Sequence, residues 1–123
     1  MKKPIINYDE ASDTLYISFE PGVDATGIEL NEHILLRIDK ENRKAIGITL
    51  LEYSLLAQKS DFGPRSFPLT GLNQLSDDSR ELVVSILLSP PVRDYLVLST
   101  YTPSYSEAIP ITSVHPLPVA TAM

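Results

Sequence analysis

The sequence predicts an α+β fold, in which an antiparallel meander sheet of four to five strands packs against a short helix and a longer helix. Three observations support this prediction. Apolar and polar residues alternate with a period of two in several segments of the first half. The connectors between these segments are short, which favours antiparallel neighbours. One segment of the second half carries apolar residues at helical spacing.

The expected strands lie between residues 5 and 51. The clearest alternation runs through Leu15–Phe19, Ile34–Ile38 and Ala45–Leu50, and shorter strands are expected at Ile5–Tyr8 and Ile28–Leu30. One face of these strands is consistently aliphatic, whereas the other mixes tyrosine, threonine, leucine and charged residues. The connectors are rich in Asp, Asn, Gly and Pro, which are the residues that favour turns.

Two helices are expected after the strands. A short helix is predicted over residues 51–59, with Leu51 and Leu55 facing the sheet as i, i+4 neighbours. A longer helix is predicted over residues 76–89. It begins at Ser76 as the N-cap, or at Asp78 as the first residue of a capping box, and it ends before Pro90-Pro91.

The chain divides by composition into residues 1–60 and residues 61–123. The first part holds two of the ten prolines and the second part holds eight. We expect the second part to be a Pro-rich extension, packed on the first as one globular unit. Its strand over residues 92–101 is expected to be buried on both faces, and to return to the first sheet or to pair across a dimer.

The composition excludes several classes of protein. The absence of cysteine excludes disulfides, thiol nucleophiles and thiolate metal sites. The chain has no apolar run of the length that a membrane helix needs, and its start does not resemble a signal peptide, so we expect a cytoplasmic protein. The formal net charge of −6 argues against nucleic acid as a partner, because phosphate binding needs a basic surface.

The sequence contains no catalytic motif, so we assign no catalytic residue, metal ligand or cofactor. Asp9, Asp13 and Asp39 form the candidate acidic cluster, because neighbouring carboxylates can share a proton or hold a divalent cation. The favoured interpretation is that aspartates at hairpin turns cap backbone N–H groups. His33 and His115 have no second ligand at metal-binding spacing, and we interpret both as surface histidines.

The first half resembles a small bacterial family called domain of unknown function 2283. The resemblance begins with the segment Tyr8-Asp9-Glu10-Ala11-Ser12-Asp13-Thr14-Leu15-Tyr16-Ile17, and it includes Ala45-Ile46-Gly47-Ile48-Thr49-Leu50-Leu51, over about residues 5–56. The family has no assigned activity, so the resemblance implies no catalytic residue. The proximity of some members to small toxin-like genes implies an antitoxin-like, neutralising role.

The leading functional hypothesis is a non-enzymatic interaction module that forms a homodimer or binds a small basic protein. The candidate interface is the apolar face of the longer helix together with the following strand; its residues are Leu82, Val83, Ile86, Leu87, Tyr95 and Val97. The alternative is a small-ligand or divalent-metal-binding protein, or a hydrolase, in which the three aspartates or His33 converge in a cleft.

Overall fold

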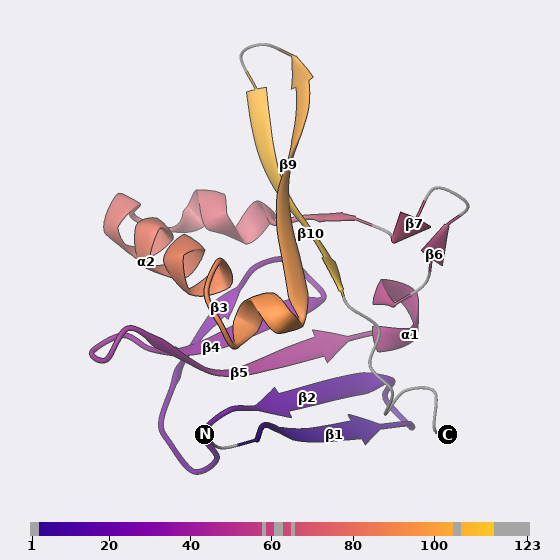
Figure 1. Cartoon of the computed structure of the whole chain (residues 1–123), viewed down its shortest axis with the longest axis vertical. Helices are drawn as coiled ribbons and strands as arrows, with labels where there is room; N and C mark the ends of the chain where they lie inside the picture. Colours follow the sequence, from indigo (N-terminus) through magenta and orange to yellow (C-terminus); the bar gives the residue numbers. More distant parts are fainter. Residues whose placement is uncertain (1–2, 58, 61–62, 65, 105–106, 115–123) are drawn as a thin grey trace.

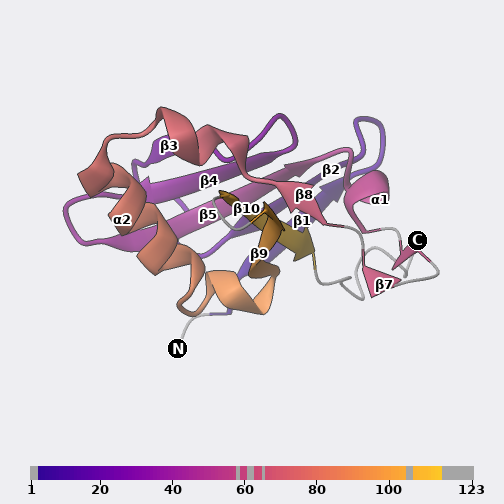
Figure 2. The ribbon, with the colours of Figure 1, turned by 90° about the horizontal axis from the view of Figure 1, so that it is seen from above.

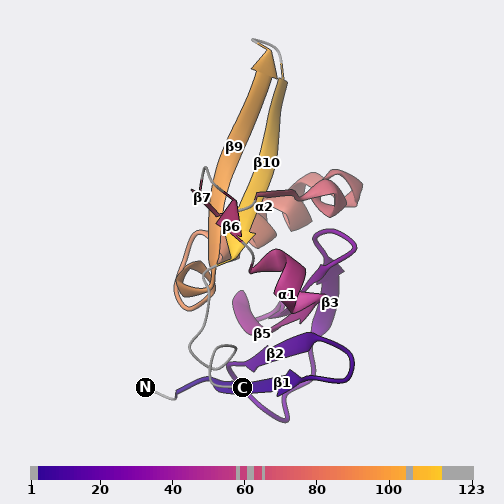
Figure 3. The ribbon, with the colours of Figure 1, turned by 90° about the vertical axis from the view of Figure 1, so that its right-hand side faces the viewer.

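The protein has two main antiparallel sheets and two α-helices, and the helices and the second sheet lie on the same side of the first sheet (Figures 1 and 3). The computed structural model describes residues 3–57, 59–60, 63–64, 66–104 and 107–114. Figure 2, seen from above, shows α2 and the second sheet over the strands of the first sheet. The predicted α+β fold class is confirmed.

The first sheet has five strands, and each strand is antiparallel to its neighbours. The strands are β1 (Ile5–Asp9), β2 (Thr14–Ser18), β3 (Thr26–Glu29), β4 (Ile34–Asp39) and β5 (Lys44–Leu51). Their spatial order is β1-β2-β5-β4-β3. The five-stranded antiparallel sheet is confirmed, but the expected meander is wrong, because a meander has its strands in consecutive order.

The central place of β5 has a physical reason. It is the longest strand of this sheet, with eight residues, and Ala45, Ile46, Ile48 and Leu50 are buried. A central strand has hydrogen-bonded neighbours on both sides. An apolar strand therefore leaves fewer backbone N–H and C=O groups unpaired at the centre of a sheet than at its edge. Period-two alternation and short connectors are compatible with a meander and with the observed order β1-β2-β5-β4-β3. The sequence pattern therefore does not distinguish the two orders.

The two faces of the first sheet differ sharply. The inner face, which the rest of the chain covers, is aliphatic and almost fully buried; its buried residues are Leu15, Ile17, Ile28, Ile34, Leu36, Ile38, Ile48 and Leu50. The side chains between them point to the opposite, outer face.

The covering layer comes from the second half of the chain. Its main elements are α2 (Asp77–Leu87), β8 (Phe67–Pro68), β9 (Leu96–Ser104) and β10 (Glu107–Val114), and its three strands have the order β8-β10-β9. The hairpin of β9 and β10 extends away from the first sheet (Figures 1 and 3). Shorter elements complete the fold: α1 (Tyr53–Leu56), β6 (Lys59–Ser60), β7 (Gly63–Pro64), and 3₁₀ helices at Thr70–Gln74 and Val92–Asp94.

Helix α2 begins where the sequence predicts. The Ser76 hydroxyl oxygen accepts a hydrogen bond of 3.2 Å from the backbone N–H of Ser79, so the N-cap is Ser76 rather than Asp78. Arg80 connects the helix to the preceding segment by hydrogen bonds. Its Nε donates to the Leu72 carbonyl at 2.9 Å, and its Nη2 donates to the Leu75 carbonyl at 3.1 Å.

The expectations for the C-terminal strand need correction. Residues 92–94 form a 3₁₀ helix, so the strand begins at Leu96, and it pairs with β10 instead of returning to the first sheet. Its pairing therefore needs no second chain. Leu96 is buried but Val97 is 39 % exposed, so the expected burial on both faces is also wrong. The strand extends away from the first sheet together with β10, so the face that carries Val97 meets solvent (Figure 1).

The short helix is also shifted from its predicted position. Leu51 ends β5 and is 42 % exposed, whereas Tyr53 and Leu56 are the helix residues that enter the core. The cause is Glu52, whose φ of 54° turns the chain between strand and helix. A left-handed residue breaks the i, i+4 relation that predicts Leu51 and Leu55 on the sheet side.

One hydrophobic cluster joins both halves of the chain. It contains first-sheet residues such as Leu36 and Ile48, together with Val83, Val92 and Val114 from the covering layer. Within the described part of the chain, no helix is long and apolar enough to cross a membrane.

Candidate functional site

The predicted interface on α2 is buried inside the protein. Leu82, Val83, Ile86 and Leu87 are between 0 % and 7 % exposed, because they pack into the core that α2 shares with the first sheet. Of the other two predicted interface residues, Tyr95 is half-buried and Val97 is exposed. The apolar face of α2 therefore meets its own chain, and a docking surface has to be sought elsewhere.

Asp13 connects β1 and α1 through hydrogen bonds at the end of the first sheet where β5 is followed by α1. It adopts a φ of 53°, and its carboxylate accepts hydrogen bonds from the Tyr8 hydroxyl at 2.5 Å and the Ser54 hydroxyl at 2.9 Å. The backbone N–H of Ser54 also donates to both carboxylate oxygens. Burial acts to raise the pKa of Asp13, but the hydrogen bonds from Tyr8 and Ser54 outweigh it, and the pKa is lowered.

Asp9 and Asp39 cap turns at opposite ends of the first sheet. Asp9 accepts from the backbone N–H of Ala11 and from the Ser12 hydroxyl. Asp39 accepts from the backbone N–H groups of Glu41 and Asn42, and the Asn42 side chain also donates to it; these bonds lower its pKa. The arrangement fits the turn-capping interpretation.

The three aspartates do not form a common site. Thr14, next to Asp13, pairs with Leu51 at one end of β5, whereas Asp39 pairs with Lys44 at the other end. The two ends are about 24 Å apart at the rise of about 3.4 Å per strand residue. Among the residues that the structure describes, no group of three or more His, Cys, Asp or Glu side chains is placed to hold a metal ion.

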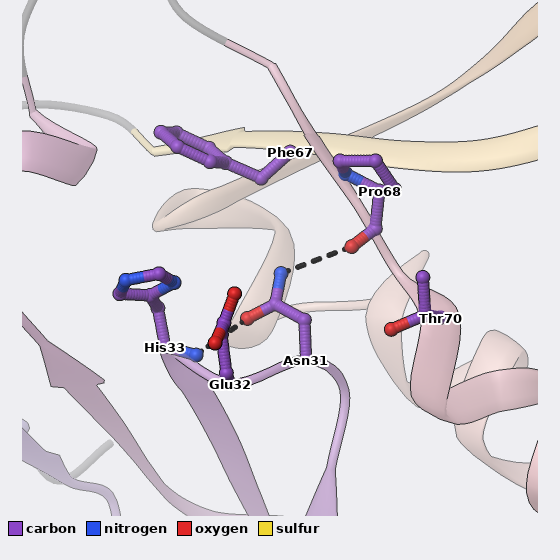
Figure 4. Close-up of a pocket in the computed structure, with 6 residues that line it drawn as sticks. All are labelled: Asn31, Glu32, His33, Phe67, Pro68 and Thr70. Carbon is purple, nitrogen blue, oxygen red and sulfur yellow. Dashed lines mark hydrogen bonds between the residues drawn. The ribbon is translucent and has the colours of Figure 1, made fainter.

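His33 lies at the Asp13 end of the sheet, beside a pocket of about 260 Å³ (Figure 4). Its Nε2 is 3.0 Å from Glu52 Oε1, and its side chain is 18 % exposed. A carboxylate-bound imidazole can act as a base, but the structure as described joins His33 to no hydroxyl nucleophile. Asn31 in the same pocket is fully engaged, since its amide binds the backbone of His33, Ile34 and Pro68.

A cavity of about 800 Å³ lies between the Pro90-Pro91 turn and the end of the first sheet where β2 ends and β5 begins. Phe19 and Tyr95 form a tilted aromatic pair there, with ring centroids 5.8 Å apart. The charged groups beside them, Glu20 and Lys44, form an ion pair at 2.9 Å. This cavity therefore presents an aromatic wall and the Glu20–Lys44 ion pair, and Lys3 and Asp94 also line it.

The described helices and the second sheet leave the outer face of the first sheet uncovered (Figure 3). The register places these residues on it: Ile5, Asn7, Tyr16, Ser18, Gly27, Glu29, Leu35, Arg37, Gly47, Thr49 and Leu51. Ile5, Tyr16 and Leu51 are 48 %, 45 % and 42 % exposed. The sequence indicates this mixed face through its outward-pointing tyrosine and leucines, but it does not show that the face is left open.

The comparisons with known proteins concern the first half of the chain. No curated protein and no solved structure matches the chain. The resemblance noted in the sequence is confirmed: residues 5–54, from the start of β1 into α1, match the family described as "Protein of unknown function (DUF2283)", and the C-terminal portion lies beyond this match.

Proposed function

We propose that the protein is a non-enzymatic interaction module that forms a homodimer through the outer face of its first sheet. One observation carries this proposal: Ile5, Tyr16 and Leu51 are each more than two-fifths exposed on one sheet face that no described element covers. Clustered exposed apolar residues mark interaction sites more often than isolated ones do. Tyrosine in particular is enriched at interfaces, because it buries a large ring and keeps a polar group.

A second copy of the chain is the simplest partner for an uncovered sheet face. Two-fold packing brings the same patch of each protomer together, as in face-to-face packed sheets. Five strands spaced by about 4.8 Å and about five residues along each strand give a footprint of roughly 400 Å². Stable complexes bury about 800 Å² of accessible surface per partner. We therefore expect a dimer that dissociates on dilution.

A small basic protein is the second candidate partner. The net charge of −6 favours association with a basic surface. The resemblance-based expectation of an antitoxin-like role also involves a partner of this kind. The same outer face serves both candidates, and the oligomeric state of the isolated chain distinguishes them.

The test is the mass of the protein in solution, measured by light scattering over a concentration series. We expect the wild type to shift from monomer to dimer, and Tyr16→Glu to remain monomeric because it places an unpaired charge in the interface. Val23→Glu is the matched control, since Val23 is 38 % exposed in the loop between β2 and β3 and lies outside the outer face.

Leu88→Glu is a second control, at the exposed end of α2. Leu88 is 55 % exposed beside an apolar groove of about 400 Å³ that Val97 also lines. We expect this variant to dimerise like the wild type. A wild type that stays monomeric throughout the series contradicts the homodimer, and a dimer broken by Leu88→Glu but not by Tyr16→Glu contradicts the outer face as its interface.

A further inference from the structure

Two oppositely charged side chains on the outer face have no partner among the residues that the structure describes. The Arg37 guanidinium and the Glu29 carboxylate form no hydrogen bond or ion pair with any described residue. The other charged residues of strands β1 to β5 are engaged: Asp9 and Asp39 cap turns, and Lys44 pairs with Glu20. Arg37 and Glu29 are thus the free charges of the surface that we propose as the interface.

The register brings Arg37 and Glu29 close to each other on adjacent strands. Arg37 in β4 is opposite Gly27 in β3, and Glu29 is opposite Leu35. The two charged residues are therefore diagonal neighbours, which are about 7–8 Å apart in an antiparallel pair. That spacing is too long for a direct ion pair unless the side chains reach toward each other, and no such pair forms.

Small residues surround Arg37 and leave room above the sheet. Arg37 is opposite Gly47 on one side and Gly27 on the other, and Gly47 is opposite Ser18. A Cβ atom built on Gly47 would lie 3.7 Å from Arg37 Nη1, so the guanidinium lies over this glycine. Arg37 is half-buried, and the glycines beside it leave space above the sheet. A partner's carboxylate can therefore approach its guanidinium.

A dimer through this face has to satisfy Arg37. An unpaired charge removed from water destabilises a complex, so the partner must supply a carboxylate at that point. In a two-fold interface, residue i contacts residue j of the other copy, and j contacts i. A face that carries one free cation and one free anion as neighbours is complementary to itself.

We propose that Arg37 of each protomer pairs with Glu29 of the second copy, and that these two reciprocal pairs set the register of the homodimer. This inference rests on the proposed homodimer. The apolar residues supply most of the free energy of association, and the charge pairs select one of the orientations in which the two faces can meet.

The test is a charge swap on the full chain, followed by light scattering and analytical ultracentrifugation. We expect Arg37→Glu alone and Glu29→Arg alone each to weaken the homodimer by about tenfold or more, because each then opposes like charges. An equimolar mixture of the two variants is expected to form a heterodimer. The double variant R37E/E29R is expected to recover the homodimer.

Two further variants separate charge from folding. Glu29→Gln removes the charge without reversing it and is expected to weaken the dimer less than Glu29→Arg does. Arg37→Lys keeps the charge and is expected to dimerise more strongly than Arg37→Glu. Circular dichroism of each dilute variant should match the wild type, since both positions are on the sheet surface.

The outcomes for this inference and for the proposed function differ. If Tyr16→Glu breaks the dimer but neither charge reversal weakens it, the Arg37–Glu29 pairing is overturned and the outer-face homodimer stands. If the reversals weaken the dimer but neither the mixture nor the double variant recovers it, the pairing is also overturned. A wild type that never dimerises overturns both proposals.

Discussion

The two faces of the first sheet are made by the same strands, yet they have different relations to the rest of the chain. The inner face holds aliphatic residues such as Leu36 and Ile48, which lie in a core shared with α2 and the second sheet. The outer face alternates with them and carries Tyr16, Leu35 and Arg37, which no described element covers. The same strands therefore stabilise the fold through their inner face, while the described elements leave their outer face uncovered.

The largest effect is expected from a buried leucine compared with its outward neighbour. Leu36→Ala removes a side chain that is 0 % exposed at the centre of the inner face. We expect a loss of about 2–5 kcal/mol in the free energy of unfolding, measured by urea denaturation of dilute protein. Leu35→Ala, at the next position but on the outer face, is expected to lose less than about 1 kcal/mol. Equal losses would contradict the assignment of the two faces.

The next effect concerns the place where the covering layer meets the edge of the sheet. The Gly71 N–H donates to the Leu30 carbonyl at 2.8 Å, and a Cβ atom on Gly71 would overlap the Glu29 carbonyl oxygen. We expect Gly71→Ala to destabilise the protein by about 2–3 kcal/mol, because the overlapping group is backbone. Thermal and urea unfolding measure this loss.

Gly27→Ala is the matched control for Gly71. A Cβ atom on Gly27 would meet only the Leu35 Cδ1 atom, at 3.4 Å, and this flexible side chain can give way. We expect its stability to stay within about 0.5 kcal/mol of the wild type. A Gly71→Ala protein as stable as Gly27→Ala would show that the covering layer is not held closely at this edge.

A smaller effect is expected at the sheet end, where Asp13 joins β2 to α1. Asp13→Asn keeps a residue that tolerates the left-handed conformation and removes the charge. Because the hydrogen bonds from Tyr8 and Ser54 are weakened, we expect a loss of about 1 kcal/mol at neutral pH. Asp24→Asn, at an exposed loop position, is the control and should leave stability unchanged.

The pH dependence of this loss follows from the lowered pKa of Asp13. The folded protein holds the ionised carboxylate more strongly than the unfolded chain, whose pKa is near 3.8. The stabilisation is therefore complete above that value and disappears as the pH falls through the lower pKa of the folded state. Melting curves should show the difference between wild type and Asp13→Asn shrinking below about pH 4. A difference independent of pH would show that the charge is not its source.

The smallest effect on folding is expected at Tyr16. Tyr16→Ala should change the unfolding free energy of dilute protein by less than about 1 kcal/mol, since the side chain is half-exposed. Its effect should appear in the concentration dependence of the melting temperature. A reversible dimer melts at a higher temperature as its concentration rises, and the variant should lose this rise. A variant that keeps the rise would contradict the role of Tyr16 in association.

Local features of the fold were predictable because they depend on neighbouring residues. The alternation around Leu15 and Ile17 gives the inner face, and Ser76 gives the start of α2, because a capping hydroxyl acts on a residue three positions away. The turns at Asp9 and Asp39 were predictable for the same reason.

Features that join distant segments were not predictable. The pairing of Tyr16 with Thr49 places β5 at the centre of the sheet. The short connectors do not predict which strand takes that position. The hydrogen bond between Asp13 and Ser54 joins residues 41 positions apart, and no local sequence motif at either residue predicts it. Whether the outer face is covered depends on where α2 and the second sheet lie. The sequence alone therefore does not indicate Arg37 and Glu29 as interface residues.

The strand order has a consequence for how the chain is made. Because β5 is the last of the five strands in the chain, the segments of the β1–β2 and β3–β4 hairpins are synthesised before the strand that joins them. Until residue 51 emerges, each hairpin has an unpaired edge, and unpaired edges are prone to associate with other chains. The segment that ends at residue 54 is thus the shortest one that closes the sheet and binds Asp13 to Ser54, which accords with the extent of the family match.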